Sequence, residues 1–154
     1  MTLKEIKKAV NSALKEKYPD VKIYGADTIE GYMRPSFFVY ITQTFSESTK
    51  NAAHKNVEIE IDFIQRAANE EEAMKFFARM EELFGQKVTA GNRNLNTNNM
   101  ELDFQGENLN IPVCRFDVEF WDQIPRKENY DTMKELIFAQ EVRTVSYTHL
   151  RAHE

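Results

Sequence analysis

The chain has 154 residues, the size of a single domain, and 42% of them are hydrophobic, so a substantial core can form. Its net charge of −5 argues against a general nucleic-acid binder, which would carry clustered Lys and Arg. The single cysteine, Cys114, excludes an internal disulfide, and no apolar run approaches the roughly 20 residues of a membrane helix. A single cysteine fits a protein of a reducing cytoplasm, and the N-terminal stretch lacks the apolar segment of an export signal.

The first predicted element is a helix from Leu3 to Tyr18. Thr2 and Glu5 match a capping box at its start, and Pro19 ends it. The basic excess of the chain lies in this helix, and a solvated lysine-rich face is the ordinary explanation of such a pattern. The apolar residues recur at steps of three and four and predict one buried stripe: Leu3, Ile6, Val10, Leu14 and Tyr18.

Three strands are predicted next. Val21–Gly25 is short and is followed by a polar loop. From Ser36 the pattern changes to a period of two, with apolar residues on both faces, which predicts a central strand covered on both sides. The polar residues from Ser46 to Asn56 indicate a mobile hairpin. Val57–Ile64 then alternates, with acidic side chains on the outward face.

The second half begins with a helix after Asn69, with three Glu in its first turn and Gly85 as a left-handed stop. The Asn-rich stretch that follows is expected to be irregular. Met100–Phe104 and Ile111–Trp121 alternate as strands, and Cys114 is expected to face inward. A final helix is predicted at about Tyr130–Val142.

The element order is therefore α-β-β-β-α-β-β-α, with neighbouring strands adjacent in sequence. This order predicts an α+β fold, a mainly antiparallel sheet of about five strands with two to three helices on one face. Residues 1–143 are expected to form one domain.

The last residues have a different character. Residues 144–154 end in "VSYTHLRAHE", which matches the translation of a transposase library adapter residue for residue. We therefore expect this tail to be non-native, disordered or loosely held. The i, i+4 pair His149 and His153 lacks the Glu that a zinc-peptidase motif needs after its first His.

No constellation for catalysis or cofactor binding stands out. His54 lies in the polar hairpin and Cys114 on an inward strand face, so neither is expected to be catalytic. The glycines form no phosphate-binding loop, and no Cys or His cluster suggests zinc. We expect no enzyme activity, no metal and no cofactor.

The acidic residues of the strands are more informative. They fall on outward faces, and paired strands would bring them together despite the cost of like charges. One interpretation is a solvated face with Arg115 interleaved. The other is a negative lumen that repels DNA phosphates and lets a duplex slide through. A glycosidase-like pair is a further possibility, although no particular pair is singled out. The residues are Glu58, Glu60, Asp62, Glu101, Asp103, Asp117 and Glu119.

Four segments of the chain form a recognisable series: "IEGYMRPSFFVYI", "VEIEIDFI", "NEEEAMKFFARMEELF" and "VCRFDVEF". In these segments the chain resembles the phage tail terminator family of tailed phages and prophages of Gram-positive bacteria, and the resemblance spans about residues 3–142. The individual matches are Ile23, Tyr24, Glu30, Gly31, Pro35, Phe37, Phe38 and Val39.

The resemblance implies a structural virion protein of the tail or neck, assembled in the host cytoplasm. It forms a ring, commonly a hexamer, that caps the head-proximal end of the tail tube and joins the head connector. Its partners would be its own copies, the tube protein and the connector protein, with DNA only as passing cargo and no membrane. The alternatives are another neck or tail completion protein with a head–tail joining role and, as a different class, a small cytoplasmic ligand-binding module.

A closed ring needs two unlike, complementary surfaces on each subunit, which edge strands and polar hairpins can supply. The hairpin Thr44–Asn56 and the segment Thr89–Asn99 are the expected contact arms. Arg34 could reach carboxylates of a neighbouring subunit or be an ordinary surface arginine, while Pro35 fixes the chain direction before the strand. The candidate contact residues are Arg34, Pro35, Ser48, Lys50, His54, Asn92, Arg93 and Asn96.

Overall fold

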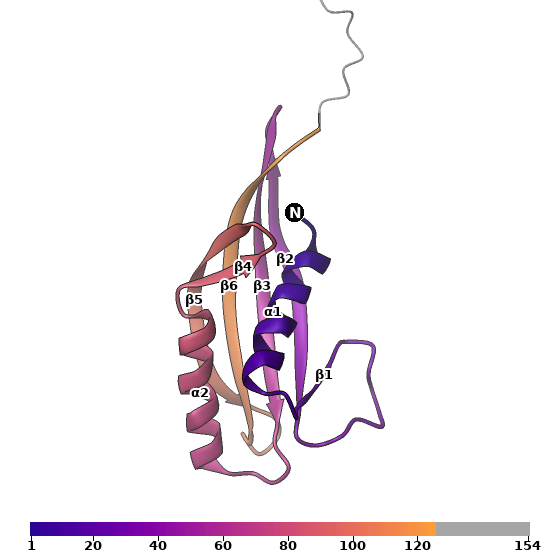
Figure 1. Cartoon of the computed structure of the whole chain (residues 1–154), viewed down its shortest axis with the longest axis vertical. Coiled ribbons are helices and arrows are strands. Elements are labelled where there is room, and N and C mark those ends of the chain that lie inside the picture. The colour runs from indigo at the N-terminus through magenta and orange to yellow at the C-terminus, as the bar shows by residue number, and fades with distance from the viewer. Residues whose placement is uncertain (126–154) are drawn as a thin grey trace, which may run out of the picture.

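The computed structural model describes residues 1–125 and has an α+β fold with one six-stranded sheet (Figure 1). The strands lie in the order β1-β2-β3-β6-β5-β4, and all neighbours are antiparallel except the pair β1 and β2. The elements are α1 Leu3–Lys17, β1 Lys22–Tyr24, β2 Ser36–Ser48, β3 Ala52–Ile64, α2 Glu70–Phe84, β4 Lys87–Ala90, β5 Arg93–Gln105 and β6 Ile111–Gln123. The α+β class is confirmed. The described part holds one strand more than the expected five.

The start of α1 follows from its cap. Thr2 accepts a hydrogen bond from the backbone N–H of Glu5, and the Glu5 carboxylate accepts one from the backbone N–H of Thr2. This capping box satisfies amide groups that the first turn leaves without a helical partner. Ile6, Val10 and Leu14 are fully buried, so the predicted stripe is confirmed at its centre, whereas Leu3 stays 38% exposed.

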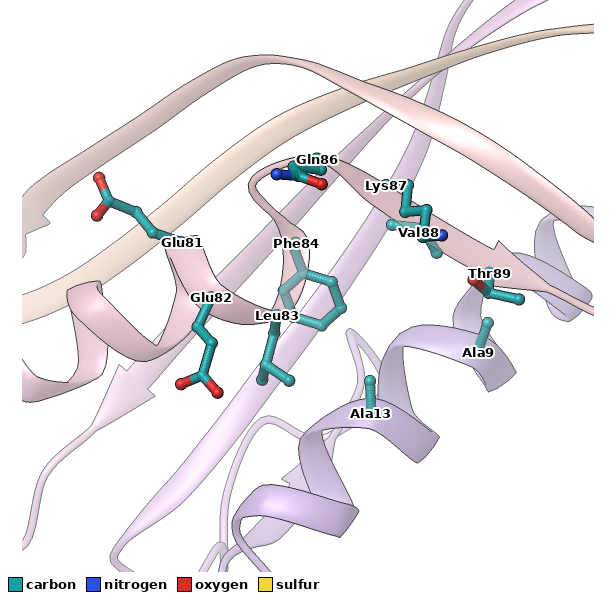
Figure 2. A pocket seen from close by; sticks show the side chains of 10 residues that line it. All are labelled: Ala9, Ala13, Glu81, Glu82, Leu83, Phe84, Gln86, Lys87, Val88 and Thr89. Carbon is teal, nitrogen blue, oxygen red and sulfur yellow. The ribbon is translucent and has the colours of Figure 1, made fainter.

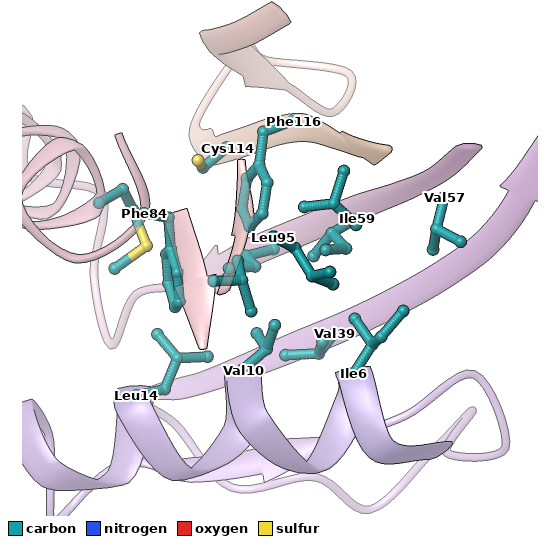
Figure 3. Packing of buried hydrophobic residues seen from close by; sticks show 14 of the residues in the cluster. Ile6, Val10, Leu14, Val39, Val57, Ile59, Phe84, Leu95, Cys114 and Phe116 are labelled. Atoms are coloured by element: carbon teal, nitrogen blue, oxygen red, sulfur yellow. The ribbon is translucent and has the colours of Figure 1, made fainter. Parts of the chain in front are cut away.

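Both helices pack on one face of the sheet, and the hydrophobic core lies between the helices and this face (Figure 3). The apolar positions of β3 and β6 alternate toward this face, as their period of two predicts. Cys114 is buried there, as expected. The opposite side of the sheet carries no helix within residues 1–125, and we call it the open face. The fully buried large side chains are Phe37, Phe76, Phe84, Phe116, Ile6, Leu14, Ile59, Ile61, Met80, Val10, Val39 and Val57.

β2 is not the central, doubly covered strand that its composition suggested. It is second from the edge, and only its first four residues, Ser36 to Val39, are buried. Phe38 is covered on the open face by the rings of Tyr24 and Tyr32, at centroid distances of 5.5 and 5.1 Å. From Thr42 to Ser48 the strand is exposed.

The polar stretch from Ser46 to Asn56 lies in a hairpin, as predicted, and most of it is paired strand. β2 and β3 pair from Ser36↔Ile64 to Ser48↔Ala53. The Asn-rich stretch forms the β4–β5 hairpin around a turn at Gly91, whose φ of 63° favours glycine. This stretch was expected to be irregular, because the polar side chains at its outward positions hid the strand pairing.

α2 begins at the Asn69 cap, whose side chain accepts hydrogen bonds from the backbone N–H groups of Glu71 and Glu72. Gly85 is not the left-handed stop that was expected, since its φ and ψ are −63° and −18°. A Cβ atom at this position would lie 2.4 Å from the Glu81 carbonyl oxygen, which is the reason for a glycine here. The final helix at about Tyr130–Val142 and the tail 144–154 lie outside the described residues.

Candidate assembly surfaces

The open face gathers all seven acidic residues of the predicted lumen. Register places Glu60 opposite Arg115 and Arg115 opposite Glu101, in one row across three strands. Asp62, Val113 and Asp103 form the next row, and Glu58 faces Asp117 in the row on the other side. Glu119 lies nearer the β2–β3 turn, opposite Asn56. Strands separated in sequence thus build one negatively charged surface.

Arg115 is the basic residue at the centre of this surface. Its guanidinium donates a hydrogen bond to Glu60, and both side chains are about three-quarters buried. Burial, and then the neighbouring Glu60, raise the pKa of Asp62 to about 7, although Arg115 acts in the opposite direction. One buried oxygen of Asp62 has no hydrogen-bond partner among the described residues. The face therefore holds its negative charge at an electrostatic cost.

Three aromatic rings lie on the open face beside the β2–β3 turn. The His54 ring stacks on Trp121 at a centroid distance of 4.7 Å, and Phe45 meets His54 edge-on at 5.6 Å. Glu47 is opposite His54 in the register, and Glu119 Oε2 is 3.7 Å from His54 Nε2. Trp121 is 57% and Phe45 45% exposed. We call Phe45, Glu47, His54, Glu119 and Trp121 the aromatic platform.

The structure moves His54 out of the loop that its polar neighbours suggested. It belongs to β3 and is half-buried against Trp121. Trp121 and Phe45 were missed as surface residues because aromatic residues are usually assigned to the core. Continuing the alternation of β6 from Asp117 and Glu119 places Trp121 on the outward face, so the sequence did contain this signal.

The candidate contact residues fall at three places. Arg34 and Pro35 lie at the start of β2, where the Arg34 guanidinium stands 5.8 Å from the centroid of the Tyr32 ring. Ser48 and Lys50 lie at the exposed end of the β2–β3 hairpin. The remaining candidates, Asn92, Arg93 and Asn96, belong to the β4–β5 hairpin.

Arg93 is held by an interaction within the subunit. It contacts Asp122 at 2.8 Å, and the same carboxylate contacts the Met1 amino group and Lys55, each at 3.0 Å. Burial raises the pKa of Asp122, but the hydrogen bonds from these three cations outweigh it and lower the pKa overall. Asp122, which sequence reasoning missed, thereby fastens the start of α1 to β6 and β5.

The helix side of the molecule has shallow grooves. One of about 400 Å³ lies between α1, the end of α2 and β4 (Figure 2). Ala9, Ala13 and Leu83 give it an apolar floor, while Glu82 and Lys87 lie at its margin. A second groove of about 520 Å³ lies between the end of α1 and α2, beside Tyr18 and Phe76.

The described residues offer little for catalysis or metal binding. Burial, and then the nearby Glu81, raise the pKa of the Cys114 thiol to about 12, so it is a poor nucleophile. Within residues 1–125 no group of three or more His, Cys, Asp or Glu is arranged to hold a metal ion. No helix in the same range is long and apolar enough to cross a membrane.

The chain was compared with solved structures, curated proteins and protein-family profiles. It is similar to a chain in the virion of a native gene transfer agent particle, with 16% identity, 76% of this chain and 92% of that chain covered, and a TM-score of 0.49. Another solved chain has 11% identity, coverage of 83% and 99%, and a TM-score of 0.48. No curated protein matches significantly. The family profile for phage tail terminator proteins matches residues 5–130, and the chain belongs to this family of phage tail structural proteins.

Proposed function

We propose that the protein caps the head-proximal end of the phage tail tube as a ring, commonly of six copies, and joins it to the head connector. The observation that carries this proposal is the family match over residues 5–130, which includes the whole sheet, α2 and α1 from Glu5 onward. The resulting assembly would belong to the virion and would form in the host cytoplasm. Tube protein and connector protein would bind its two opposite rims.

The β2–β3 hairpin is the proposed contact arm of the ring. It extends beyond the start of α1 at one end of the molecule (Figure 1). β1 pairs only with Ser36 to Phe38, so within residues 1–125 the outer edge of β2 has no strand partner beyond this point. An arm with a free edge and an exposed aromatic surface suits a heterologous contact with the next copy. Ser48, Lys50 and His54 lie on this arm.

The acidic part of the open face is proposed to line the channel. Glu58, Glu60, Asp62, Asp103 and Asp117 share this face, together with Glu101 and Glu119. A negatively charged wall repels phosphate, so DNA passes without binding. Arg115, held by Glu60, does not remove the excess of negative charge.

Tube growth tests the proposal directly. Purified tube protein should polymerise without limit alone and stop when this chain is added in substoichiometric amounts, with the chain found at one tube end. Arg34→Glu should weaken end binding if the Arg34 corner is a contact, with Lys22→Glu as a control for an exposed cation on the neighbouring strand. Tubes that elongate equally with and without the chain would contradict capping. Binding to the connector but not to tubes would favour another head–tail joining role.

A further inference from the structure

A stripe of lysines on α1 has no partner within the described subunit. Lys4, Lys8 and Lys15 are exposed, and their spacing of four and seven places them on one side of the helix. The opposite side of α1 carries the stripe that packs on the sheet. No ion pair joins these three lysines to another residue of the range 1–125, although Lys17 pairs with Glu82. Like charges at this spacing destabilise a helix slightly, so a function outside the subunit is a reasonable explanation.

The aromatic platform has the complementary chemistry. Its Phe45 and Trp121 rings are large and exposed, and Glu47 and Glu119 flank the platform. A lysine has an aliphatic stem that can lie on an aromatic ring and an ammonium group that seeks a carboxylate. The platform therefore suits a pair of lysine side chains better than it suits phosphate, which Glu47 and Glu119 would repel.

The lysine stripe and the platform lie on opposite faces of the subunit at the same level along the strands. The Met1 amino group contacts Asp122, and Asp122 follows Trp121 in β6 with its side chain on the helix face. The first turns of α1 therefore lie directly behind the platform, as the position of the N-terminus beside the upper strands also shows (Figure 1). In a ring whose axis runs along the strands, each copy is related to the next by rotation about that axis. Rotation leaves the position of a patch along the axis unchanged, so two patches at the same level can meet between neighbouring copies.

We propose that Lys4 and Lys8 of one copy dock on the aromatic platform of the next copy, with their ammonium groups at Glu47 and Glu119. The contact is front to back, so each subunit offers one half and receives the other, as a closing ring requires. The inference rests on the proposed ring and names one of its contacts. The contact covers Glu119 at the hairpin end, and the other six acidic residues of the open face stay uncovered toward the channel.

Charge reversal tests the contact. Three double variants are made. The first carries Lys4→Glu and Lys8→Glu, and the second carries Glu47→Lys and Glu119→Lys. The third, Lys22→Glu and Lys87→Glu, is the control and changes exposed lysines elsewhere. Sedimentation measures self-association, and labelled protein measures retention at tube ends, across a range of salt. The first two proteins should each lose about tenfold or more in association, while the control keeps the affinity of the unmodified chain. Thermal melting confirms that all three are folded.

Mixing gives the decisive outcome. An equimolar mixture of the two reversed proteins should regain association, because every alternating contact again joins opposite charges. Unchanged association of either reversed protein, or a mixture that stays dissociated, would overturn the inference. Binding of labelled duplex DNA is measured as well. A Lys4→Glu, Lys8→Glu protein that loses DNA binding but not self-association would assign the lysines to nucleic acid and also overturn the inference.

If the unmodified chain caps tubes but reversal has no effect, only this inference fails. If the unmodified chain associates in a charge-dependent way but never caps tubes, only the proposed function fails. If it neither associates nor caps tubes, both the inference and the proposed function are overturned.

Discussion

Asp62 shows how a single residue carries the cost of the acidic face. Between its ordinary pKa of 3.8 and the folded-state pKa of about 7, the folded chain holds a proton that the unfolded chain has released. The free energy of unfolding therefore falls as pH rises through this window and is lowest, for this group, above pH 7. Asp62→Asn should raise stability at pH 8 by about 1–2 kcal/mol, after discounting for partial exposure, and change it little at pH 4. Urea unfolding at both pH values measures this, and an equal effect at the two would refute it.

Asp122 has the opposite character, since three cations hold its pKa low. Its stabilising contribution is present above the unfolded pKa and is lost as pH falls through the depressed folded value. We expect Asp122→Asn to lower the free energy of unfolding at pH 7 by about 1–3 kcal/mol, because Lys55 and Arg93 lose a half-buried partner. Asp20→Asn, in an exposed turn, is the matched control and should be nearly neutral. Equal melting temperatures for the two variants would show that the cluster does not stabilise the fold.

At the scale of elements, the end of α2 depends on Gly85. Its backbone is right-handed, so Gly85→Ala would ordinarily gain stability by reducing the freedom of the unfolded chain. Here the new Cβ would meet the Glu81 carbonyl oxygen at 2.4 Å, and we expect a loss of about 1–3 kcal/mol instead. Chemical denaturation of the variant measures the sign. A gain in stability would show that the helix end relaxes without cost.

The elements with the clearest periodicity could be predicted from the sequence. α1, α2, β3 and β6 match their apolar patterns, and outward alternation on β3, β5 and β6 correctly identified the acidic positions. β4 was missed because its four residues lie in an Asn-rich stretch, and long-range pairing with β5, rather than local propensity, makes it a strand. The β2–β3 hairpin was underestimated for the same reason.

The surfaces depend on pairing between distant strands, which no single segment specifies. His54, Trp121 and Phe45 meet only because β2, β3 and β6 are neighbours in a given register. Asp122 gathers groups from the N-terminus, β3 and β5. Such clusters follow from topology, so sequence reasoning found the charges but not their partners.

At the scale of the whole molecule, we expect one set of aromatic residues to stabilise the fold and another to contribute to association between copies. Phe76 is buried and stacks against Phe63 and Phe37 at centroid distances of 5.2 and 5.9 Å. Phe76→Ala should cost about 3–5 kcal/mol of unfolding free energy. Phe45→Ala should cost less than about 1 kcal/mol while weakening association, because Phe45 lies on the exposed platform. Thermal melting and sedimentation on both variants separate the two effects, and a Phe45 variant that associates normally would remove Phe45 from the contact.

The two sides of the subunit are unlike, with helices and lysines on one and carboxylates and exposed rings on the other. Two unlike sides suit the proposed ring, in which each copy contacts the next through two different surfaces. Imaging of tail tubes grown in the presence of the chain tests this most directly. We predict one closed ring of identical subunits at a single end of each tube, with the acidic face toward the channel. Tubes with bare ends, or with the chain bound along their sides, would contradict it.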